Sequence, residues 1–356
     1  VFRTLSGVRV VDAATGEPVW NFVTGSYKSG RPPNLGYINR GLGFWQRGTE
    51  ERLFMITSDS YLFAFDPETG RPVETFGDTG WVDTVDYVPR LHRARGYGHP
   101  SGPAVCRDTV IIGSSVTDGP TTRTNVPGRV LGFDAESGAL RWAFNLVPQD
   151  GEYGVDSWEE ESWRYTGHAN VWAPISVDED LGYVYLPTST PSNDFCGGHR
   201  KGDNLFAESI LCLDAETGER VWHFQTVHHG LWDYDNPAAP ILCNIEVDGK
   251  PIKALAQLTK QGFTFVLDRV TGEPVWPIEE RSVPQSSVPG EQTSPTQPFP
   301  TKPPAFVRQG VALDDLIDYT PEIRARAEAI LAHYNYGPLY TPPTLDRPTI
   351  VMPGWG

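Results

Sequence analysis

A ten-residue stretch, HHGLWDYDNP at 228–237, combines two imidazoles, two carboxylates and one indole. It follows an apolar run typical of a strand and ends at a proline that favours a turn. Imidazoles and carboxylates are the side chains that most often hold metal ions or transfer protons. The stretch is therefore a candidate for chemistry. The alternative is a turn in which the carboxylates accept hydrogen bonds from backbone N–H groups.

The composition favours a β protein that does not bind nucleic acid. The 356 residues include 11 Trp, 36 Gly and 32 Pro, which suits many turns and large flat packing surfaces. The formal net charge of −16 would repel a phosphate backbone or an anionic membrane surface. No apolar run of about 18 residues predicts a transmembrane helix, and no signal-peptide pattern opens the chain. Because residue 1 is Val rather than Met, we expect residues to be missing at both ends.

The four cysteines do not predict a zinc site. None of them has the CxxC spacing, and the two neighbouring histidines of the opening stretch do not complete a zinc site either. Free buried thiols are the simplest interpretation, and one disulfide is the alternative. The cysteines are Cys106, Cys196, Cys212 and Cys243.

One phrase recurs five times and organises the chain. The copies are VVDAATGEPVW (10–20), AFDPETGRPVE (64–74), GFDAESGALRW (132–142), CLDAETGERVW (212–222) and VLDRVTGEPVW (266–276). In each copy an apolar strand is expected to end at the Asp, whose carboxylate accepts turn N–H groups, and the Gly suits a positive φ. The closing Trp starts the next strand and offers a large packing surface.

This hairpin, with further strand signals between its copies, predicts one four-stranded blade for each repeat. The spacing between copies is uneven, so we expect insertions of different size on a common scaffold. The second copy has Glu74 in place of the Trp, and we expect poorer packing at that junction. Two segments depart from the repeat, one expected to be a loop and the other a helix. Residues 283–304, rich in Pro, Ser, Gln and Thr, are predicted to be an extended surface loop.

A single short helix is predicted after that loop. Thr320 suits the N-cap, Pro321 the first helical position and Glu322 the positive end of the helix dipole. The apolar residues that follow are expected on one face of the helix. They are Ile323, Ala327, Ile330, Leu331 and Tyr334.

The repeated phrase is similar to the tryptophan-docking motif of quinoprotein dehydrogenases, the eight-bladed β-propellers that use pyrroloquinoline quinone (PQQ). The resemblance covers residues 36–354 and is strongest to the membrane-bound glucose dehydrogenase subgroup. Four stretches carry it, GSSVTDG (113–119), NVWAP (170–174), TVHHGLWDYDNPA (226–238) and LTKQGFTFVLDR (258–269). It implies an all-β fold in which 1–356 is one PQQ-repeat propeller domain, incomplete at both ends.

The resemblance implies a catalytic base and a cation site. The Asp that follows the Trp in the 226–238 stretch serves as the base in this family, and here it is Asp233. Asp118, Thr190 and Asp233 are implied as metal ligands, with Ca²⁺ favoured over a lanthanide or Mg²⁺, since oxygen ligands suit a hard cation. Thr190 stands where many alcohol-oxidising relatives have Asn, and the glucose type has Thr. Alternatively, Asp118 only stabilises its loop and Thr190 is an ordinary turn residue.

The same resemblance assigns four contacts to PQQ. Trp172 corresponds to the indole beneath the planar quinone, and Lys260 to a cation that faces the quinone oxygens. Arg40 corresponds to an arginine that binds the cofactor carboxylates, and Ser115 to a hydrogen-bond donor. Ordinary core packing is the alternative for Trp172, and a surface ion pair is the alternative for Lys260.

Some positions depart from the pattern or leave it open. Trp45 lies where glucose-type relatives often have His, which argues against glucose itself and for another sugar, a polyol or an alcohol. The adjacent-cysteine disulfide of methanol-type enzymes is absent. Asp235 accompanies a lanthanide in some relatives but also occurs in the glucose type, so it does not select the metal. We expect His229 at the rim of the site and His228 in a structural role.

The resemblance implies oxidation of a sugar, polyol or alcohol hydroxyl to a carbonyl or lactone by hydride transfer to metal-bound PQQ. Electrons would pass to a quinone or cytochrome acceptor in the periplasm, with any membrane association made through a segment outside these residues. A non-catalytic propeller scaffold is one alternative, although it has no reason to keep Asp118, Trp172, Asp233 and Lys260 together. A degenerate quinoprotein that folds without holding the cofactor is the other, because five phrases do not complete eight blades.

Overall fold

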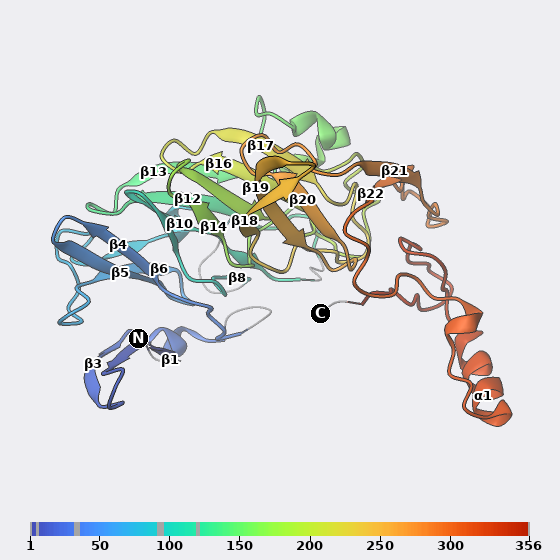
Figure 1. The fold of residues 1–356 in the computed structure, drawn as a ribbon, viewed down its shortest axis with the longest axis horizontal. Helices are drawn as coiled ribbons and strands as arrows, with labels where there is room; N and C mark the ends of the chain where they lie inside the picture. Colours follow the sequence, from blue (N-terminus) through green and yellow to red (C-terminus); the bar gives the residue numbers. More distant parts are fainter. Residues whose placement is uncertain (1, 5–6, 32–35, 91–95, 119–121, 355–356) are drawn as a thin grey trace.

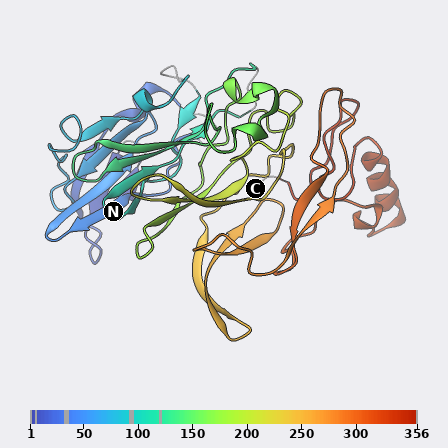
Figure 2. The ribbon, with the colours of Figure 1, turned by 90° about the horizontal axis from the view of Figure 1, so that it is seen from above.

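The computed structural model describes residues 2–4, 7–31, 36–90, 96–118 and 122–354. Nearly all of its regular structure is antiparallel β-sheet, as the repeated hairpins predict. Figure 1 shows the sheets following one another in chain order as an arc, from the N-terminal strands to β21 and β22. Seen from above in Figure 2, successive sheets lie side by side, and each packs one face against its neighbour.

Each sheet pairs strands that are close in the sequence, and three sheets have the four strands predicted for a blade within the described residues. These are β4 (Gly43–Arg47), β5 (Glu50–Ile56), β6 (Tyr61–Phe65) and β7 (Trp81–Asp83); β9 (Ala104–Cys106), β10 (Thr109–Ile112), β12 (Arg129–Asp134) and β13 (Leu140–Asn145); and β14 (Ser176–Asp178), β15 (Tyr183–Pro187), β16 (Ser209–Asp214) and β17 (Arg220–Gln225).

The remaining sheets in the described part of the chain are smaller. They comprise β1 (Phe2–Thr4), β2 (Gly7–Val11) and β3 (Pro18–Val23); β8 (Tyr97–Gly98) and β11 (Ser115–Val116); β18 (Ile241–Val247), β19 (Lys250–Leu258) and β20 (Thr264–Asp268); and β21 (Ile278–Ser282) and β22 (Thr296–Pro300). Short 3-10 helices lie at Ser26–Ser29, Val85–Tyr87, Val155–Ser157, Glu159–Arg164 and Leu313–Asp315.

The turn in each repeat has the predicted hydrogen bonds. In the fourth copy, Asp214 Oδ1 accepts the backbone N–H groups of Glu216 at 3.0 Å and Thr217 at 2.9 Å. The Thr217 hydroxyl donates to the same oxygen, and Gly218 closes the turn with a φ of 73°. The aspartates of the other four copies accept equivalent N–H groups. The carboxylate therefore fixes the turn, as the sequence predicts.

The closing tryptophans hold neighbouring blades together. The Trp142 indole N–H donates to Ala215 O of the next repeat at 3.0 Å, and its ring covers Gly218, where a Cβ would lie 2.6 Å from the ring. Trp222 makes the same contact with the fifth repeat, donating to Arg269 O at 3.1 Å. Trp20 does so with the second repeat. Each indole thus donates to a carbonyl oxygen of the next repeat, and Arg269 O also accepts the Tyr185 hydroxyl at 3.0 Å.

The junction without a tryptophan is closed by other side chains. The Arg52 guanidinium, from β5, donates to Ala135 O at 2.8 Å. Ala135 follows the turn aspartate of the third repeat, as Ala215 does in the fourth, so the guanidinium replaces the indole N–H. Phe76 is fully buried at this junction and lies beside the turn. The poorer packing expected from Glu74 is thus offset by residues outside the repeated phrase.

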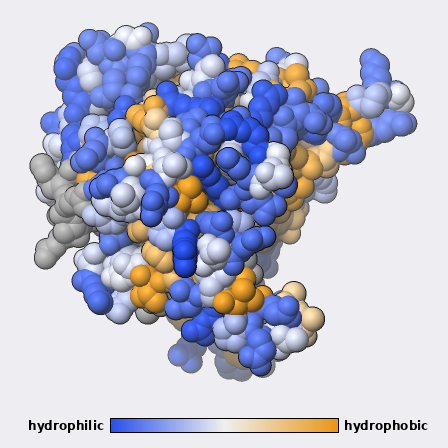
Figure 3. All heavy atoms as spheres, turned by 90° about the vertical axis from the view of Figure 1, so that its left-hand side faces the viewer, coloured by the Kyte–Doolittle hydropathy of each residue, from blue (hydrophilic) through white to orange (hydrophobic). Residues whose placement is uncertain are grey.

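The hydrophobic core lies between neighbouring sheets. One cluster joins the β9–β13 sheet to the β14–β17 sheet, and a second joins the β14–β17 sheet to the β18–β20 sheet. Figure 3 shows that the N-terminal side of the molecule is covered mainly by hydrophilic residues, with hydrophobic ones in small groups. Among the described residues, no helix has the length and apolar character that a bilayer crossing requires.

The helix α1 (Pro321–Leu331) forms where the sequence predicts it, and the Thr320 hydroxyl caps the Ile323 N–H. Its apolar residues do not form a buried face, however. Leu331 is 3% exposed, whereas Ile323 is 39% and Ile330 53% exposed. Figure 1 shows why, because α1 projects away from the sheets and has only one side near the rest of the chain.

Two further expectations concern the 283–304 segment and the cysteines. The segment runs as irregular chain only in part, since residues 296–300 form β22, which pairs with β21. Regular alternation is broken there by prolines, which hid the strand from sequence reasoning. All four cysteines are free, and those at 106 and 212 are buried.

Arg52→Met should show how much the replacement contact contributes. Because Ala135 O would be left buried without a donor, we expect the free energy of unfolding to fall by about 1–3 kcal/mol. Denaturation in guanidinium chloride, followed by tryptophan fluorescence, measures this change. Arg71→Met, at an exposed position of the second repeat, is the matched control and should change stability by less than about 0.5 kcal/mol. Equal losses in both variants would contradict the assigned role.

Candidate active site

The candidate site is built from connections between strands, which is where functional side chains usually lie on a rigid scaffold. Segments from several blades contribute to it. They supply Arg40 before β4, Asp118 after β11, Trp172 between β13 and β14, Thr190 between β15 and β16, Asp233 between β17 and β18, and Lys260 between β19 and β20.

The WDYD part of the opening stretch alternates between the core and the site. Trp232 and Tyr234 are each 1% exposed and pack with Tyr340 in a hydrophobic cluster. The Trp232 indole also donates to Thr341 O at 2.9 Å. With both aromatic residues anchored in the core and Asp233 in a left-handed conformation (φ 55°), the carboxylates of Asp233 and Asp235 face Lys260 at the site. The C-terminal part of the chain thereby fixes the carboxylates.

Lys260 lies between the two carboxylates of this stretch. Its Nζ is 3.1 Å from Asp233 Oδ1 and 3.2 Å from Asp235 Oδ2. The Trp172 indole N–H donates to the same Asp235 oxygen at 2.9 Å. The ammonium also lies 5.9 Å from the centre of the Trp172 ring. The structure therefore brings Asp233, Lys260 and Trp172 together, as the resemblance implies.

Arg40 joins this group from another blade. Its guanidinium carbon is 5.3 Å from the centre of the Trp172 ring. An indole with two cations over it suits a flat ligand that carries carboxylates, because the ring offers apolar area and the cations offer charge. Ser115 lies buried in β11, at the start of the segment that leads to Asp118.

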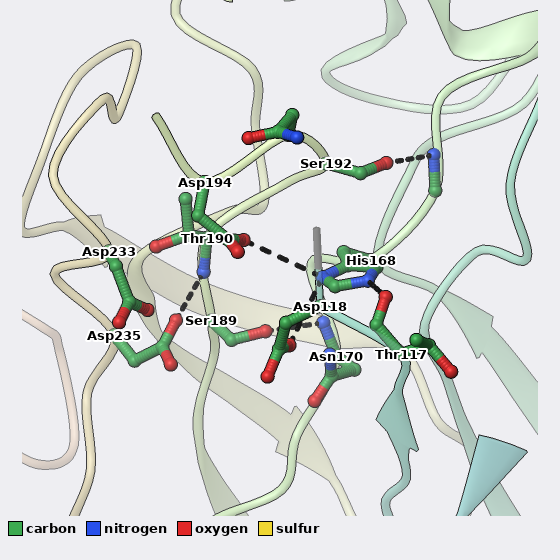
Figure 4. A network of polar contacts seen from close by, with 12 residues as sticks. Thr117, Asp118, His168, Asn170, Ser189, Thr190, Ser192, Asp194, Asp233 and Asp235 are labelled. Atoms are coloured by element: carbon green, nitrogen blue, oxygen red, sulfur yellow. Dashed lines mark hydrogen bonds and ion pairs between the residues drawn. The ribbon is translucent and has the colours of Figure 1, made fainter. Parts of the chain in front are cut away.

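Three groups able to bind a metal ion lie near these side chains. The ligand atoms of Asp118, His168 and Asp194 lie within 4.8 Å of one another. His168 Nδ1 is 3.8 Å from a carboxylate oxygen of each aspartate, and its Nε2 faces Thr117 O. Figure 4 shows Asp118 and Asp194 near the His168 ring, with Thr190, Asp233 and Asp235 on the other side of the same region. The oxygen donors suit a hard cation such as Ca²⁺.

Of the predicted ligands, Thr190 is held by two hydrogen bonds. Its backbone N–H donates to Asp235 Oδ1 at 2.6 Å, and its hydroxyl donates to Glu208 Oε1 at 2.9 Å. Asp118 belongs to the group with His168 and Asp194, whereas Asp233 lies outside that group. The sequence reasoning missed Asp194 and Glu208. Asp194 lies only four residues after Thr190 in the same connection, which is the signal that could have revealed it.

The acidic groups of the site repel one another and are shielded from water. Burial raises the pKa of the Asp233 carboxyl to about 8, with Asp235 adding to the rise and Lys260 opposing it. Burial also raises the pKa of Asp194. A pKa raised towards neutral pH brings a carboxyl into the range of proton-transfer groups, and it acts as a general base once its own proton is lost.

Several residues around the site have left-handed backbone conformations. Asp233 has a φ of 55°, His168 60°, Ala169 52° and Glu208 45°. Such conformations cost roughly 1–3 kcal/mol each for most non-glycine residues and are concentrated at functional sites. Their grouping in the connections that carry the site supports a functional role for these loops.

The expectation that His229 lies at the rim of the site is wrong. His229 is 1% exposed, and its Nε2 lies 2.7 Å from Glu291 Oε1, while Nδ1 faces Gly202 O at 2.8 Å. This contact ties the 283–304 segment to the stretch that carries Asp233. His228 contacts Gln225 and Glu280, as suits the structural role expected for it.

Trp45 is also placed differently from what the sequence suggested. It is 3% exposed in β4, packs with the core cluster of its own and the next blade, and donates to Asp108 Oδ1 at 2.8 Å. The guanidinium groups of Arg47 and Arg52 lie 5.3 Å from its ring centre. Its side chain is occupied by these inter-blade contacts, so its identity gives no basis for choosing among substrates.

Comparison with known proteins gives a consistent result. Residues 2–356 match the family model of the glucose/ethanol/alcohol dehydrogenase β-propeller domain, labelled PQQ. The chain is 34% identical to the quinoprotein glucose dehydrogenase of Escherichia coli, over 85% of this chain and 37% of that protein. It is 32% identical to the glycerol dehydrogenase large subunit of Gluconobacter oxydans, over 97% and 47%.

Among solved structures, the chain is similar to the quinohemoprotein alcohol dehydrogenase from Comamonas testosteroni. The TM-score is 0.63 at 25% identity, and the match covers 83% of this chain and 42% of that chain. These matches confirm the predicted propeller class, whereas the number of eight blades stays a prediction. The chain spans less than half the length of the relatives it matches.

Glu208 generates a prediction about pH. Burial raises its pKa to about 8 from an ordinary 4.5, with Asp235 adding to the rise and Arg200 opposing it. The folded protein therefore holds this proton more tightly than the unfolded chain does, and the resulting stability is lost as pH rises from 4.5 towards 8. Relative to Glu208→Gln, the wild-type protein should lose roughly 3 kcal/mol of unfolding free energy between about pH 5 and 8.

Denaturant titrations of both proteins across this pH range measure the difference. Glu216→Gln, at an exposed position in the turn of the fourth repeat, serves as the control and should follow the wild-type curve. Parallel curves for the wild type and Glu208→Gln would show that the buried carboxyl is not protonated in the folded protein.

Proposed function

Because the chain belongs to the family of glucose/ethanol/alcohol dehydrogenase β-propeller domains, we propose that it carries the PQQ and cation site of a dehydrogenase that oxidises hydroxyl groups. The contact between Lys260, Asp233 and Trp172 is the observation that best supports this proposal. In this contact a cation, a carboxyl suited to proton transfer and an aromatic ring come together from three separate connections. A non-catalytic scaffold would not need these three side chains to be in contact.

In this proposal the chain binds and orients its ligands through a few groups. Trp172 provides the flat surface on which PQQ rests, and Arg40 and Lys260 provide charge complementary to its anionic groups. When bound, PQQ supplies the oxidation by accepting the hydride that leaves the substrate carbon. Asp233 accepts the proton of the substrate hydroxyl, and Lys260 stabilises the carboxylate before the transfer.

The cation would be held by the carboxylates near His168 and by oxygens on the opposite side of the same region. Asp118 and Asp194 supply the first set, and Thr190 and Asp233 the second. A divalent ion such as Ca²⁺ would relieve the repulsion between these carboxylates and would draw electron density from an oxygen bound to it. His168 would add a nitrogen ligand to this set, because its Nδ1 faces both aspartates.

The substrate class, acceptor and location remain part of the proposal. Relatives are named for glucose, for glycerol and for quinate/shikimate with quinone as acceptor. We propose a sugar, polyol or alcohol as substrate, with a carbonyl or lactone as product. Electrons would pass to a quinone or a cytochrome, and the family resemblance favours the periplasm.

Reconstitution tests the function directly. The purified chain is incubated with PQQ and Ca²⁺, and dye reduction is followed with a panel of sugars, polyols and alcohols. We expect reduction with at least one hydroxyl substrate and none when PQQ is omitted. Quenching of tryptophan fluorescence should report PQQ binding. If PQQ does not bind at micromolar concentration, the scaffold or the degenerate quinoprotein is the better interpretation.

Asp233→Asn tests the base. The amide cannot accept the substrate proton, so turnover should fall by about 10²–10⁴-fold, whereas PQQ binding should change little. Asp248→Asn is a matched control, because Asp248 is exposed and has a similar φ of 51°. Turnover by Asp233→Asn equal to that of Asp248→Asn would remove Asp233 from the proposed role.

A further inference from the structure

Glu208 is fully buried beneath the candidate site, and the chemistry proposed above does not use it. Its backbone joins two of the connections that form the site. The Glu208 N–H donates to Ser189 O at 3.1 Å, and Glu208 O accepts from the Thr226 N–H at 2.7 Å. The side chain therefore starts from a fixed position between the connection with Thr190 and the one with Asp233.

The carboxyl of Glu208 is directed at Thr190. Its Oε1 accepts the Thr190 hydroxyl at 2.9 Å, whereas its Oε2 is buried without a hydrogen-bond partner among the described residues. An unpartnered buried acceptor costs about 1–3 kcal/mol, so the carboxyl is not placed there for the stability of the fold. Among the described residues, the only side chain that forms a hydrogen bond with it is that of Thr190, a proposed cation ligand.

Gly230 provides the space for this carboxyl. A Cβ at this position would lie 1.8 Å from Glu208 Oε2, and the φ of Gly230 is one that any residue can adopt. Glycine is therefore required here for room and not for backbone conformation. The chain keeps a side chain off the stretch that carries Asp233, and this vacated volume holds the Glu208 carboxyl.

We propose that Glu208 is a positioning residue that orients the Thr190 hydroxyl for the cation. A hydroxyl has one hydrogen and two lone pairs, and only a lone pair can bind a cation. By accepting the hydrogen, Glu208 Oε1 leaves the lone pairs of Thr190 Oγ1 free to face the ion. Partners that orient a metal ligand in this way typically contribute 10–100-fold to metal affinity. The inference rests on the proposed function, in which Thr190 is a ligand.

Calorimetric titration of Ca²⁺ into the 356-residue protein, saturated with PQQ, measures the effect. Glu208→Ala removes the acceptor and should raise the Kd for Ca²⁺ by about 10–100-fold. Glu208→Gln retains an acceptor oxygen and should raise the Kd much less. If the alanine variant does not fold, as judged by thermal melting, Glu208→Met provides the same loss of acceptor with the volume filled. An unchanged Kd in a folded variant without the acceptor overturns the proposal.

The Thr190→Val background separates orientation from a general structural effect. Without the hydroxyl there is nothing to orient, so adding Glu208→Ala should change the Kd no further, whereas in the Thr190→Ser background the full loss should persist. If adding Glu208→Ala raised the Kd for Ca²⁺ equally in the Thr190→Val and Thr190→Ser backgrounds, the proposal would be overturned. If Thr190→Val alone leaves the Kd unchanged, Thr190 is not a ligand and the proposed cation site itself fails. A loss with Thr190→Val but none with Glu208→Ala overturns only the role of Glu208.

Discussion

The pairing of one ammonium with two carboxylates is the interaction on which the candidate site depends. Lys260 is within 3.2 Å of both Asp233 and Asp235, and its side chain is 7% exposed. Two neighbouring carboxylates in so dry a place would repel each other strongly, and the ammonium would be costly to bury alone. The three groups can be buried only together. Their positions are therefore coupled, although they come from different connections.

That coupling requires the blades to be placed accurately. Lys260 lies in the turn between β19 and β20, and the aspartates follow β17 of the preceding blade. Trp222 joins these two blades, because its indole donates to Arg269 O and its ring covers Gly272. The repeated phrase thus does more than build hairpins. It sets the distance between blades on which the ion contacts depend.

The Arg52 contact shows which part of the docking interaction is essential. A guanidinium and an indole have different shapes, yet both donate to the carbonyl that follows a turn aspartate. The aromatic surface can be replaced by Phe76, but the buried carbonyl still needs a donor. The hydrogen bond is thus retained where the tryptophan is not. A search for the tryptophan alone would fail to recognise such a junction between blades.

Sequence reasoning succeeded where the signal is local and failed where it depends on distant segments. The turn aspartates and the cap at Thr320 follow from neighbouring residues. The burial of Trp45 and the exposure of Ile330 could not be read in this way, because each depends on whether another element lies opposite. Glu208 was missed for the same reason, because its contact with Thr190 is not apparent from its neighbours in the sequence. Asp194, by contrast, lies close to Thr190 in the sequence and could have been found.

The residues around Thr190 show that the site is not arranged for stability. Glu208 has an unpartnered oxygen, and several residues adopt left-handed conformations that other sequences would avoid. Strain and unpartnered polar atoms persist in folded proteins where the rest of the structure is stable enough to hold them and where function requires them. The inter-blade contacts provide that stability, and a cation among the carboxylates would remove much of the remaining repulsion.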